Sequence, residues 1–148
     1  MGAELQGTAT FINKETGESE RFKGVAEGTR DTVFRLDFCE NGENPQKIYV
    51  FESAIDVLSF LQIFRQLYGC EKLKGCALVS MAGLKPEALK PFIESGTEII
   101  SCVDNDEHGQ KFNRQNGFKD AEMLVNEGVK DWNELVLRWN AGGSWAVV

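Results

Sequence analysis

The sequence predicts an α/β fold, in which a parallel sheet is flanked by helices and preceded by an antiparallel β appendage. Short apolar runs alternate with helical segments from residue 46 onward, which is typical of parallel strands joined by crossover helices. The first 45 residues instead carry short β-prone segments separated by turn signals. The 148 residues, 42% of them hydrophobic, are enough for one compact core. We therefore expect a β-rich appendage over residues 1–45, an α/β domain over 46–140 and a tail over 141–148.

The appendage is predicted from three β-prone segments. Residues 8–12 and 21–23 flank a turn signal at residues 15–18. In residues 32–38 apolar and polar side chains alternate with a period of two, which predicts a half-buried strand. Asn41-Gly42 then marks a turn. We see no catalytic chemistry in this part of the chain.

Three buried strands and three helical segments are predicted in the α/β domain. Residues 47–51, 76–81 and 97–103 are short apolar runs, as expected for strands buried on both faces. Residues 54–68, a segment from Pro86 towards Glu94 that Pro91 should shorten, and a segment starting at Glu107 have helical character. We find no convincing fourth strand between residues 118 and 130, where residues 121–125 favour a helix instead.

The composition limits the classes of function. A net charge of -7 argues against strong unaided binding to DNA or RNA, because neutralising phosphates requires clustered Lys and Arg. The most basic stretch, between Lys72 and Lys90, is as well explained by a solvated lysine face as by a surface for a charged substrate. The sequence has neither a signal peptide nor an apolar run of about 20 residues, so we expect a cytoplasmic protein without membrane contact.

A zinc site is not expected. The four cysteines lack paired C-x-x-C spacing, and His108 is the single histidine. Cys76 and Cys102 lie in apolar runs and are best explained as buried, reduced thiols.

Three carboxylates are the strongest indication of chemistry. Glu52 directly follows the first predicted strand of the domain, and Asp104 and Asp106 directly follow the third. Ligands of parallel α/β sheets bind beyond the carboxyl ends of the strands. Residues two apart in extended chain point the same way, roughly 6.6–6.8 Å apart at Cα. If the two strands are neighbours, the three side chains can converge, and an oxygen-only cluster suits Mg²⁺ or Mn²⁺.

The Asp104-Asn105-Asp106 segment also fits roles without a metal. On its pattern alone, it is more often a solvated turn or the N-cap of a helix. A calcium-binding EF-hand loop is excluded, because His108 and Gln115 stand where ligands should be and a strand precedes the segment.

The sequence resembles the Toprim family over about residues 20 to 137. Residues 49–56 (YVFESAID) resemble its first motif, a hydrophobic strand that ends in a glutamate, with an aspartate shortly after. Residues 99–109 (IISCVDNDEHG) resemble the second, a strand running into D-x-D-x-x-G, and residues 79–83 (VSMAG) match the strand-to-glycine turn between them. Residues 130–134 (KDWNE) are similar to the K-D-x-N-E segment of primase-like members. The likeness is greatest to Toprim-like domains of plasmid and mobile-element proteins.

The resemblance implies a Rossmann-like sheet with Mg²⁺ held by Glu52, Asp104 and Asp106 as the catalytic residues, Mn²⁺ being a substitute. Glu52 would also be the general acid or base. Asp56 would support the ligands from behind, although a plain exposed aspartate explains it equally well. Gly83 would allow a tight turn near the phosphate, and Gly109 would let the following helix approach the sheet, unless both are ordinary turn glycines.

Our leading hypothesis is Mg²⁺-dependent chemistry on DNA or RNA phosphodiesters, as a nuclease, a primase-like nucleotidyltransferase or a topoisomerase-like strand-passage module. Tyr49 and Tyr68, the only tyrosines, lie in apolar runs that predict core positions, so no tyrosine nucleophile is expected. The alternative is a non-catalytic metal- or nucleic-acid-binding module that depends on other domains of a larger plasmid replication or mobilisation protein. A phosphatase-like hydrolase of small phosphoesters is a third, weaker hypothesis.

Overall fold

The computed structural model describes residues 4–17, 19–25, 33–40, 42–121 and 128–142. The chain divides into two compact units, Met1–Thr32 and Val33–Val148. Each unit contains a sheet of its own, of two strands in the first and five in the second.

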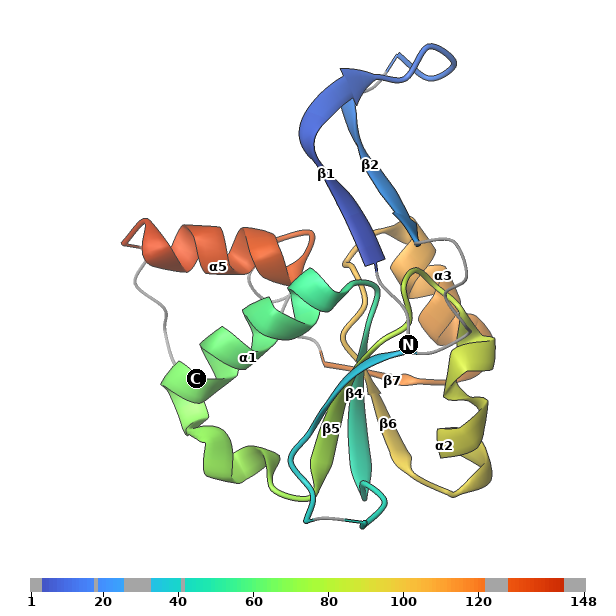
Figure 1. The fold of residues 1–148 in the computed structure, drawn as a ribbon, viewed down its shortest axis with the longest axis vertical. Helices are drawn as coiled ribbons and strands as arrows, with labels where there is room; N and C mark the ends of the chain where they lie inside the picture. The colour runs from blue at the N-terminus through green and yellow to red at the C-terminus, as the bar shows by residue number, and fades with distance from the viewer. Residues whose placement is uncertain (1–3, 18, 26–32, 41, 122–127, 143–148) are drawn as a thin grey trace. The chain divides into compact units, whose positions relative to one another are not determined.

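The first unit contains an antiparallel pair of strands, β1 (Glu4–Ile12) and β2 (Ser19–Val25) (Figure 1). Their register runs from Glu4 opposite Val25 to Ile12 opposite Ser19 and shifts between Gln6 and Thr10. Asn13 forms the turn: its carbonyl accepts from Gly17 N at 2.8 Å and its Oδ1 from Glu15 N at 2.8 Å. The predicted N-terminal antiparallel strands are confirmed.

The second unit is built on a five-stranded sheet in the order β3-β5-β4-β6-β7. Four strands run parallel: β4 (Lys47–Phe51), β5 (Cys76–Ser80), β6 (Glu98–Ser101) and β7 (Lys119–Asp120). β3 (Phe34–Asp37) runs antiparallel to β5. The predicted α/β fold with a mostly parallel sheet is confirmed.

The strand predicted over residues 32–38 exists, but its partner differs from our expectation. We placed it in the N-terminal appendage, whereas β3 pairs with β5, from Phe34 opposite Ser80 to Asp37 opposite Ala77. Period-two alternation specifies a strand with one buried face and leaves its neighbour undetermined. In the structure, the chain divides after Thr32, so residues 33–45 belong to the unit that contains the parallel sheet.

The absence of a fourth parallel strand was a wrong prediction. β7 pairs with β6 through Ile100 opposite Lys119 and Ser101 opposite Asp120. Two residues are too few to show any periodicity, which explains why the sequence did not reveal the strand. Of the helix predicted over residues 121–125, all but Ala121 lies outside the described residues.

Helices cover both faces of the sheet (Figure 1). One face carries α1 (Ala54–Tyr68) and α5 (Trp132–Asn140), and the other carries α2 (Lys90–Glu94) and α3 (Glu107–Asn116). Short 3-10 turns at Cys70–Leu73 and Pro86–Leu89 complete the connections. Pro91 lies in the first turn of α2, a position that tolerates the missing N–H, so the helical segment expected from Pro86 is split there.

Two hydrophobic clusters hold these layers together. Successive side chains of a strand point to opposite faces, so Phe51 joins Phe60 and Trp132 under α1 and α5, while Val50 joins the cluster under α2 and α3. Phe51 and Val50 are fully buried. Burying each such side chain contributes about 1.5–3 kcal/mol, which explains why the central strands are apolar throughout.

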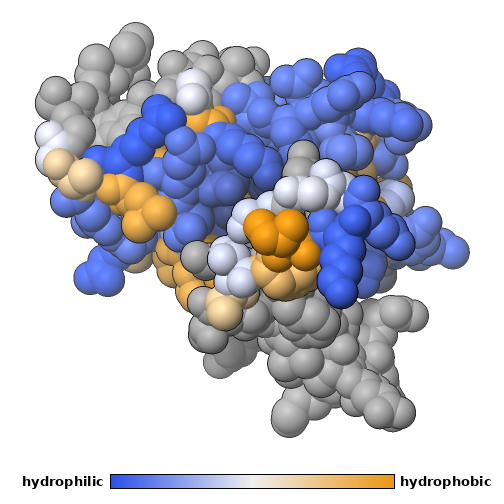
Figure 2. All heavy atoms as spheres, turned by 90° about the horizontal axis from the view of Figure 1, so that it is seen from above, coloured by the Kyte–Doolittle hydropathy of each residue, from blue (hydrophilic) through white to orange (hydrophobic). Residues whose placement is uncertain are grey.

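One face of the molecule can be described by its hydropathy. On the face shown in Figure 2, hydrophilic residues predominate and hydrophobic ones gather in small groups between them. The helices of the described part of the chain include none that combines the length and the apolar character needed to cross a membrane. Cys76 and Cys102 are buried free thiols, and burial raises the pKa of both.

Candidate metal centre

Glu52 and Asp104 meet because their strands are neighbours. β4 pairs with β6 in parallel, and the last bond of this pairing, from Cys102 N to Val50 O, measures 2.8 Å. The two carboxyl ends therefore lie side by side. Beyond them, the backbone N–H of Asp104 donates to Glu52 Oε1 at 3.3 Å.

Asp106 faces the same place while it also caps a helix. It is the N-cap of α3, and its Oδ1 accepts from Gly109 N at 3.0 Å. Its Oδ2 lies 3.7 Å from Lys130 Nζ, which also lies 3.5 Å from Asp104 Oδ2. The N-cap role is thus correct for Asp106. It does not exclude a metal site, because Oδ2 of Asp106 is left to interact with Lys130 Nζ, which also lies near Asp104 Oδ2.

Gly83 positions the backbone of Glu52. Its N–H donates to the carbonyl of Glu52 at 2.7 Å, and the preceding contact from Met81 N to Phe51 O measures 2.9 Å. Gly83 has a φ of +105°, a conformation that side-chain-bearing residues rarely adopt. Glycine at this turn therefore lets the chain after β5 hold Glu52 at the end of β4.

Asp56 is buried beside the site. Ser53 caps α1: its Oγ accepts from Asp56 N at 3.2 Å and donates to Asp56 Oδ2 at 2.5 Å. Because Asp56 is only 7% exposed, the interpretation of it as a plain exposed aspartate is wrong. Its charge reaches the site and acts on Asp104.

Gly109 allows the first turn of α3 to press against the aspartate loop. A Cβ atom at this position would lie 2.0 Å from the carbonyl oxygen of Asp104. No side chain fits at that distance, so α3 could not begin where it does with any other residue here.

The loop of Asp104 to Asp106 is tied to the segment before α5, a link that the sequence did not reveal. Asn105 N donates to Lys130 O at 2.7 Å, and Asn105 Nδ2 donates to Val129 O at 3.1 Å. The Asp-Asn-Asp pattern assigns no role to its middle residue. The preference of asparagine for hydrogen-bonded turns was the one available signal.

Lys130 stands next to the carboxylates because α5 begins there. Asp131 caps α5 through its Oδ1, which accepts from Glu134 N at 2.7 Å, and Glu134 Oε2 accepts from Lys130 N at 2.9 Å. The resemblance singled out this segment without assigning Lys130 a partner. Asn133 and, on α3, His108, Lys111 and Arg114 are exposed.

Carboxylates of like charge repel one another at the site. Burial, then the carboxylates of Glu52 and Asp56, raise the pKa of Asp104 from 3.8 to about 7, against the opposing effect of Lys130. Burial lowers the pKa of Lys130, but the aspartates, Asp104 first, outweigh it, and the pKa of Lys130 is raised. The site therefore holds more negative charge than one ammonium neutralises.

The residues fit a hard divalent cation. Within the described residues, no group of three or more His, Cys, Asp or Glu side chains is already arranged around a metal position. Glu52, Asp104 and Asp106 nevertheless offer oxygen ligands only, and a cation would relieve the repulsion that Glu52 and Asp56 exert on Asp104. Lys130 shows that a positive charge is accommodated between the two aspartates.

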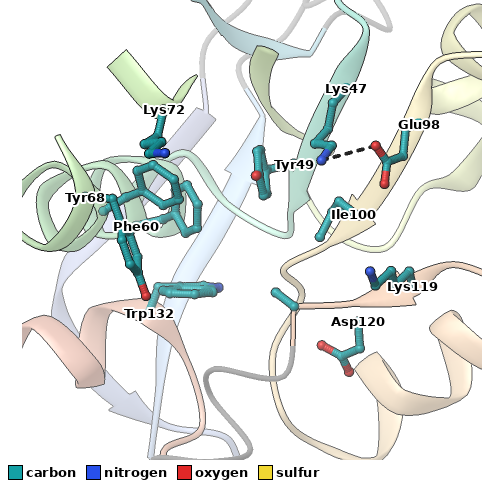
Figure 3. A pocket seen from close by; sticks show the side chains of 12 residues that line it. Lys47, Tyr49, Phe60, Tyr68, Lys72, Glu98, Ile100, Lys119, Asp120 and Trp132 are labelled. Atoms are coloured by element: carbon teal, nitrogen blue, oxygen red, sulfur yellow. Dashed lines mark ion pairs between the residues drawn. The ribbon is translucent and has the colours of Figure 1, made fainter. Parts of the chain in front are cut away.

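A cavity of about 710 Å³ lies elsewhere on the second unit. Aromatic rings of β4, α1 and α5 surround it, and Lys47 forms an ion pair of 3.1 Å with Glu98 at its wall (Figure 3). Lys47 and Glu98 are the first residues of β4 and β6, whereas Glu52 and Asp104 follow the last. The cavity is therefore distinct from the candidate centre.

Comparison with known proteins identifies the family. The family model described as Toprim-like matches residues 49–136, which is more than half of the chain and includes Glu52, Asp104, Asp106 and Lys130. Neither the curated proteins nor the solved structures gave a match. Toprim domains act on nucleic acids and generally bind Mg²⁺. The chain belongs to the Toprim-like family.

Proposed function

We propose that this domain performs Mg²⁺-dependent phosphodiester chemistry on DNA or RNA, with Glu52, Asp104 and Asp106 as ligands and catalytic residues. The observation that supports it is the contact between Asp104 N and Glu52 Oε1, 3.3 Å long, where β4 and β6 end side by side. Asp106 adds a third carboxylate, which shares Lys130 with Asp104.

The ligand atoms that the site offers support Mg²⁺ or Mn²⁺ as the bound ion. Three carboxylates provide only oxygen, the ligand atom that Mg²⁺ and Mn²⁺ prefer. When bound, the ion supplies positive charge that polarises a phosphoryl group and neutralises the charge developing on it. Asn105 N and Gly109 N donate hydrogen bonds that hold the loop with both aspartates at the carboxyl ends of the strands.

Glu52 is the candidate for proton transfer. The N–H of Asp104 orients its Oε1, and the Glu52 backbone is held by Gly83. A carboxylate oriented in this way can accept a proton from an attacking oxygen or return one to a leaving oxygen. Its action requires that the substrate phosphate lies within hydrogen-bond reach.

Tyrosine-dependent strand passage would require a tyrosine other than the two in this sequence. Tyr49 packs against Phe60 with 5.2 Å between ring centroids, and burial raises its pKa. Tyr68 is 46% exposed, so its predicted core position is wrong, but it ends α1 and lies far along that helix from Glu52. Neither is placed to attack a phosphate at the carboxylates.

A non-catalytic module within a plasmid replication or mobilisation protein is the second candidate. The net charge of -7 favours it, because an acidic chain binds phosphates weakly unless other domains contribute cations. Cleavage by the chain alone separates the two proposals.

Incubation with supercoiled plasmid in Mn²⁺ or Mg²⁺ tests the proposal. We expect metal-dependent nicking by the wild-type chain, loss of nicking by Glu52→Gln, and retention by Glu87→Gln, a matched change at an exposed position. Metal binding without cleavage would support the module instead. A chain that binds neither Mn²⁺ nor Mg²⁺ in calorimetry would contradict both proposals.

A further inference from the structure

Lys130 contacts the two carboxylate oxygens that a divalent ion would need. Its Nζ is 3.5 Å from Asp104 Oδ2 and 3.7 Å from Asp106 Oδ2. A metal ion bound to the same oxygens would repel the nearby ammonium, because both are cations and the distance between them would be short. Loading the site with a divalent ion therefore requires the ammonium to move.

The side chain can move without its backbone. Both peptide groups of Lys130 are fixed, since its carbonyl accepts from Asn105 N at 2.7 Å and its N–H donates to Glu134 Oε2 at 2.9 Å. The side chain itself is 58% exposed, while that of Asp104 is 13% exposed. A flexible four-carbon stem on a fixed backbone lets the ammonium turn outward and stay within reach of the site.

The ammonium that leaves the aspartates has a suitable new partner. Once a divalent ion occupies the aspartate oxygens and offsets part of their charge, a phosphate of the bound strand offers the ammonium a new anionic partner. The acidic chain offers few other cations here: among the described residues, Lys130 is the one lysine or arginine with ion pairs to Asp104 and Asp106.

We propose that Lys130 exchanges partners during the working cycle: it holds Asp104 and Asp106 in the metal-free site, and it contacts substrate phosphate once a divalent ion has replaced it. This inference rests on the proposed function of the site. Lys130 is then a positioning residue for the aspartates and a binding residue for nucleic acid.

The test measures two affinities for the full chain and three variants. Lys130→Met removes the ammonium and keeps an unbranched stem, and Lys130→Arg keeps the charge. Lys72→Met is the matched control, because Lys72 is exposed in the turn that follows the far end of α1 from Glu52. Calorimetry measures Mn²⁺ affinity, and anisotropy with a short labelled single-stranded DNA at saturating Mn²⁺ measures nucleic-acid affinity.

We expect Lys130→Met to bind Mn²⁺ about three- to tenfold more tightly than wild type, because an exposed ion pair no longer competes. At saturating Mn²⁺ the same variant should bind the DNA about three- to tenfold more weakly than wild type does, and Lys130→Arg should recover much of the lost affinity. Lys72→Met should leave Mn²⁺ affinity unchanged and weaken DNA binding less. A structural defect would lower metal affinity, so a gain in metal affinity separates the two explanations. Melting curves of each variant verify folding.

Two outcomes would overturn the inference while the proposed function stands. One is a wild-type chain that binds Mn²⁺ together with a Lys130→Met variant of equal or lower Mn²⁺ affinity. The other is a loss of DNA binding that is the same for Lys130→Met and Lys72→Met. A wild-type chain without any Mn²⁺ binding would instead refute the proposed function itself.

Discussion

Replacing Asp104 with asparagine should stabilise the metal-free protein at neutral and alkaline pH. The carboxylate of Asp104 is partly buried near Glu52 and Asp56, and burial and these two charges raise its pKa from 3.8 to about 7. Each pKa unit corresponds to about 1.36 kcal/mol, so ionising Asp104 in the folded protein costs about 4 kcal/mol relative to the unfolded chain. Asparagine has nearly the shape of the protonated acid and avoids this cost.

The sign of the pH dependence follows from linkage. Below about pH 4 the carboxyl group is protonated in both states, so wild type and Asp104→Asn should differ little. As the pH rises from about 4 to about 7, the unfolded chain releases the proton and the folded protein retains it. Wild type therefore loses stability over this range, and the difference in favour of the variant grows to about 4 kcal/mol near pH 8.

Urea denaturation followed by tryptophan fluorescence measures these differences. The titrations are run with EDTA near pH 4, pH 6 and pH 8, with Glu87→Gln as a surface control that should match wild type throughout. With Mg²⁺ at a hundredfold excess over its dissociation constant, wild type should gain about 2.7 kcal/mol and the variant less. An Asp104→Asn protein that is less stable than wild type near pH 8, or equally altered at every pH, would refute the reasoning.

The remaining predictions concern packing, capping and ligand selectivity. Gly109→Ala places a Cβ against the carbonyl of Asp104 and should cost about 1–3 kcal/mol in thermal unfolding, with Lys111→Ala nearly neutral; equal melting of both variants would contradict it. Asp131→Ala should cost about 1 kcal/mol by removing the cap of α5, and an unchanged melting temperature would argue against that cap. Calorimetry should detect Mn²⁺ binding and no dedicated Zn²⁺ site; tight Zn²⁺ binding without Mn²⁺ binding would count against the oxygen ligands. Duplex DNA should bind weakly, more tightly with Mg²⁺ and less with added salt, whereas tight metal-independent binding in anisotropy would reveal a basic surface that the net charge conceals.

The central elements of the fold were predictable because burial determines them. The structure has β4 at Lys47–Phe51 and α1 at Ala54–Tyr68, the same bounds that the apolar run and the helical spacing indicate. Both faces of β4 are covered, so its sequence is continuously apolar, and Ser53 supplies a clear N-cap. β3 and β7 at the edges of the sheet were not predictable in the same way. Their pairing depends on neighbours distant in the chain, which local periodicity does not encode.

The candidate site was only half visible in the sequence. That Glu52 and Asp104 lie together could be predicted because each follows a buried strand at the end where parallel sheets bind ligands, while the role of Glu52, Asp104 and Asp106 as metal ligands stays a prediction. The positions of Lys130 and Asn105 could not be predicted, since they depend on how the start of α5 docks against the aspartate loop. Asn105 and Lys130 are 25 positions apart, and no local sequence pattern predicts the hydrogen bond between them.

The hydrogen bonds from Asn105 to Val129 and Lys130 bear on how the domain can be cut and fused. A gene fragment that ends after β7 would encode every strand of the described residues and all three carboxylates, yet it would lack the two carbonyls that accept from Asn105. It would also lack Trp132, whose Nε1 donates to Cys102 O at 2.8 Å beneath the same loop. In a chimera, a junction placed before Val129 should therefore preserve the ligands and lose their alignment, while one placed beyond α5 should keep both.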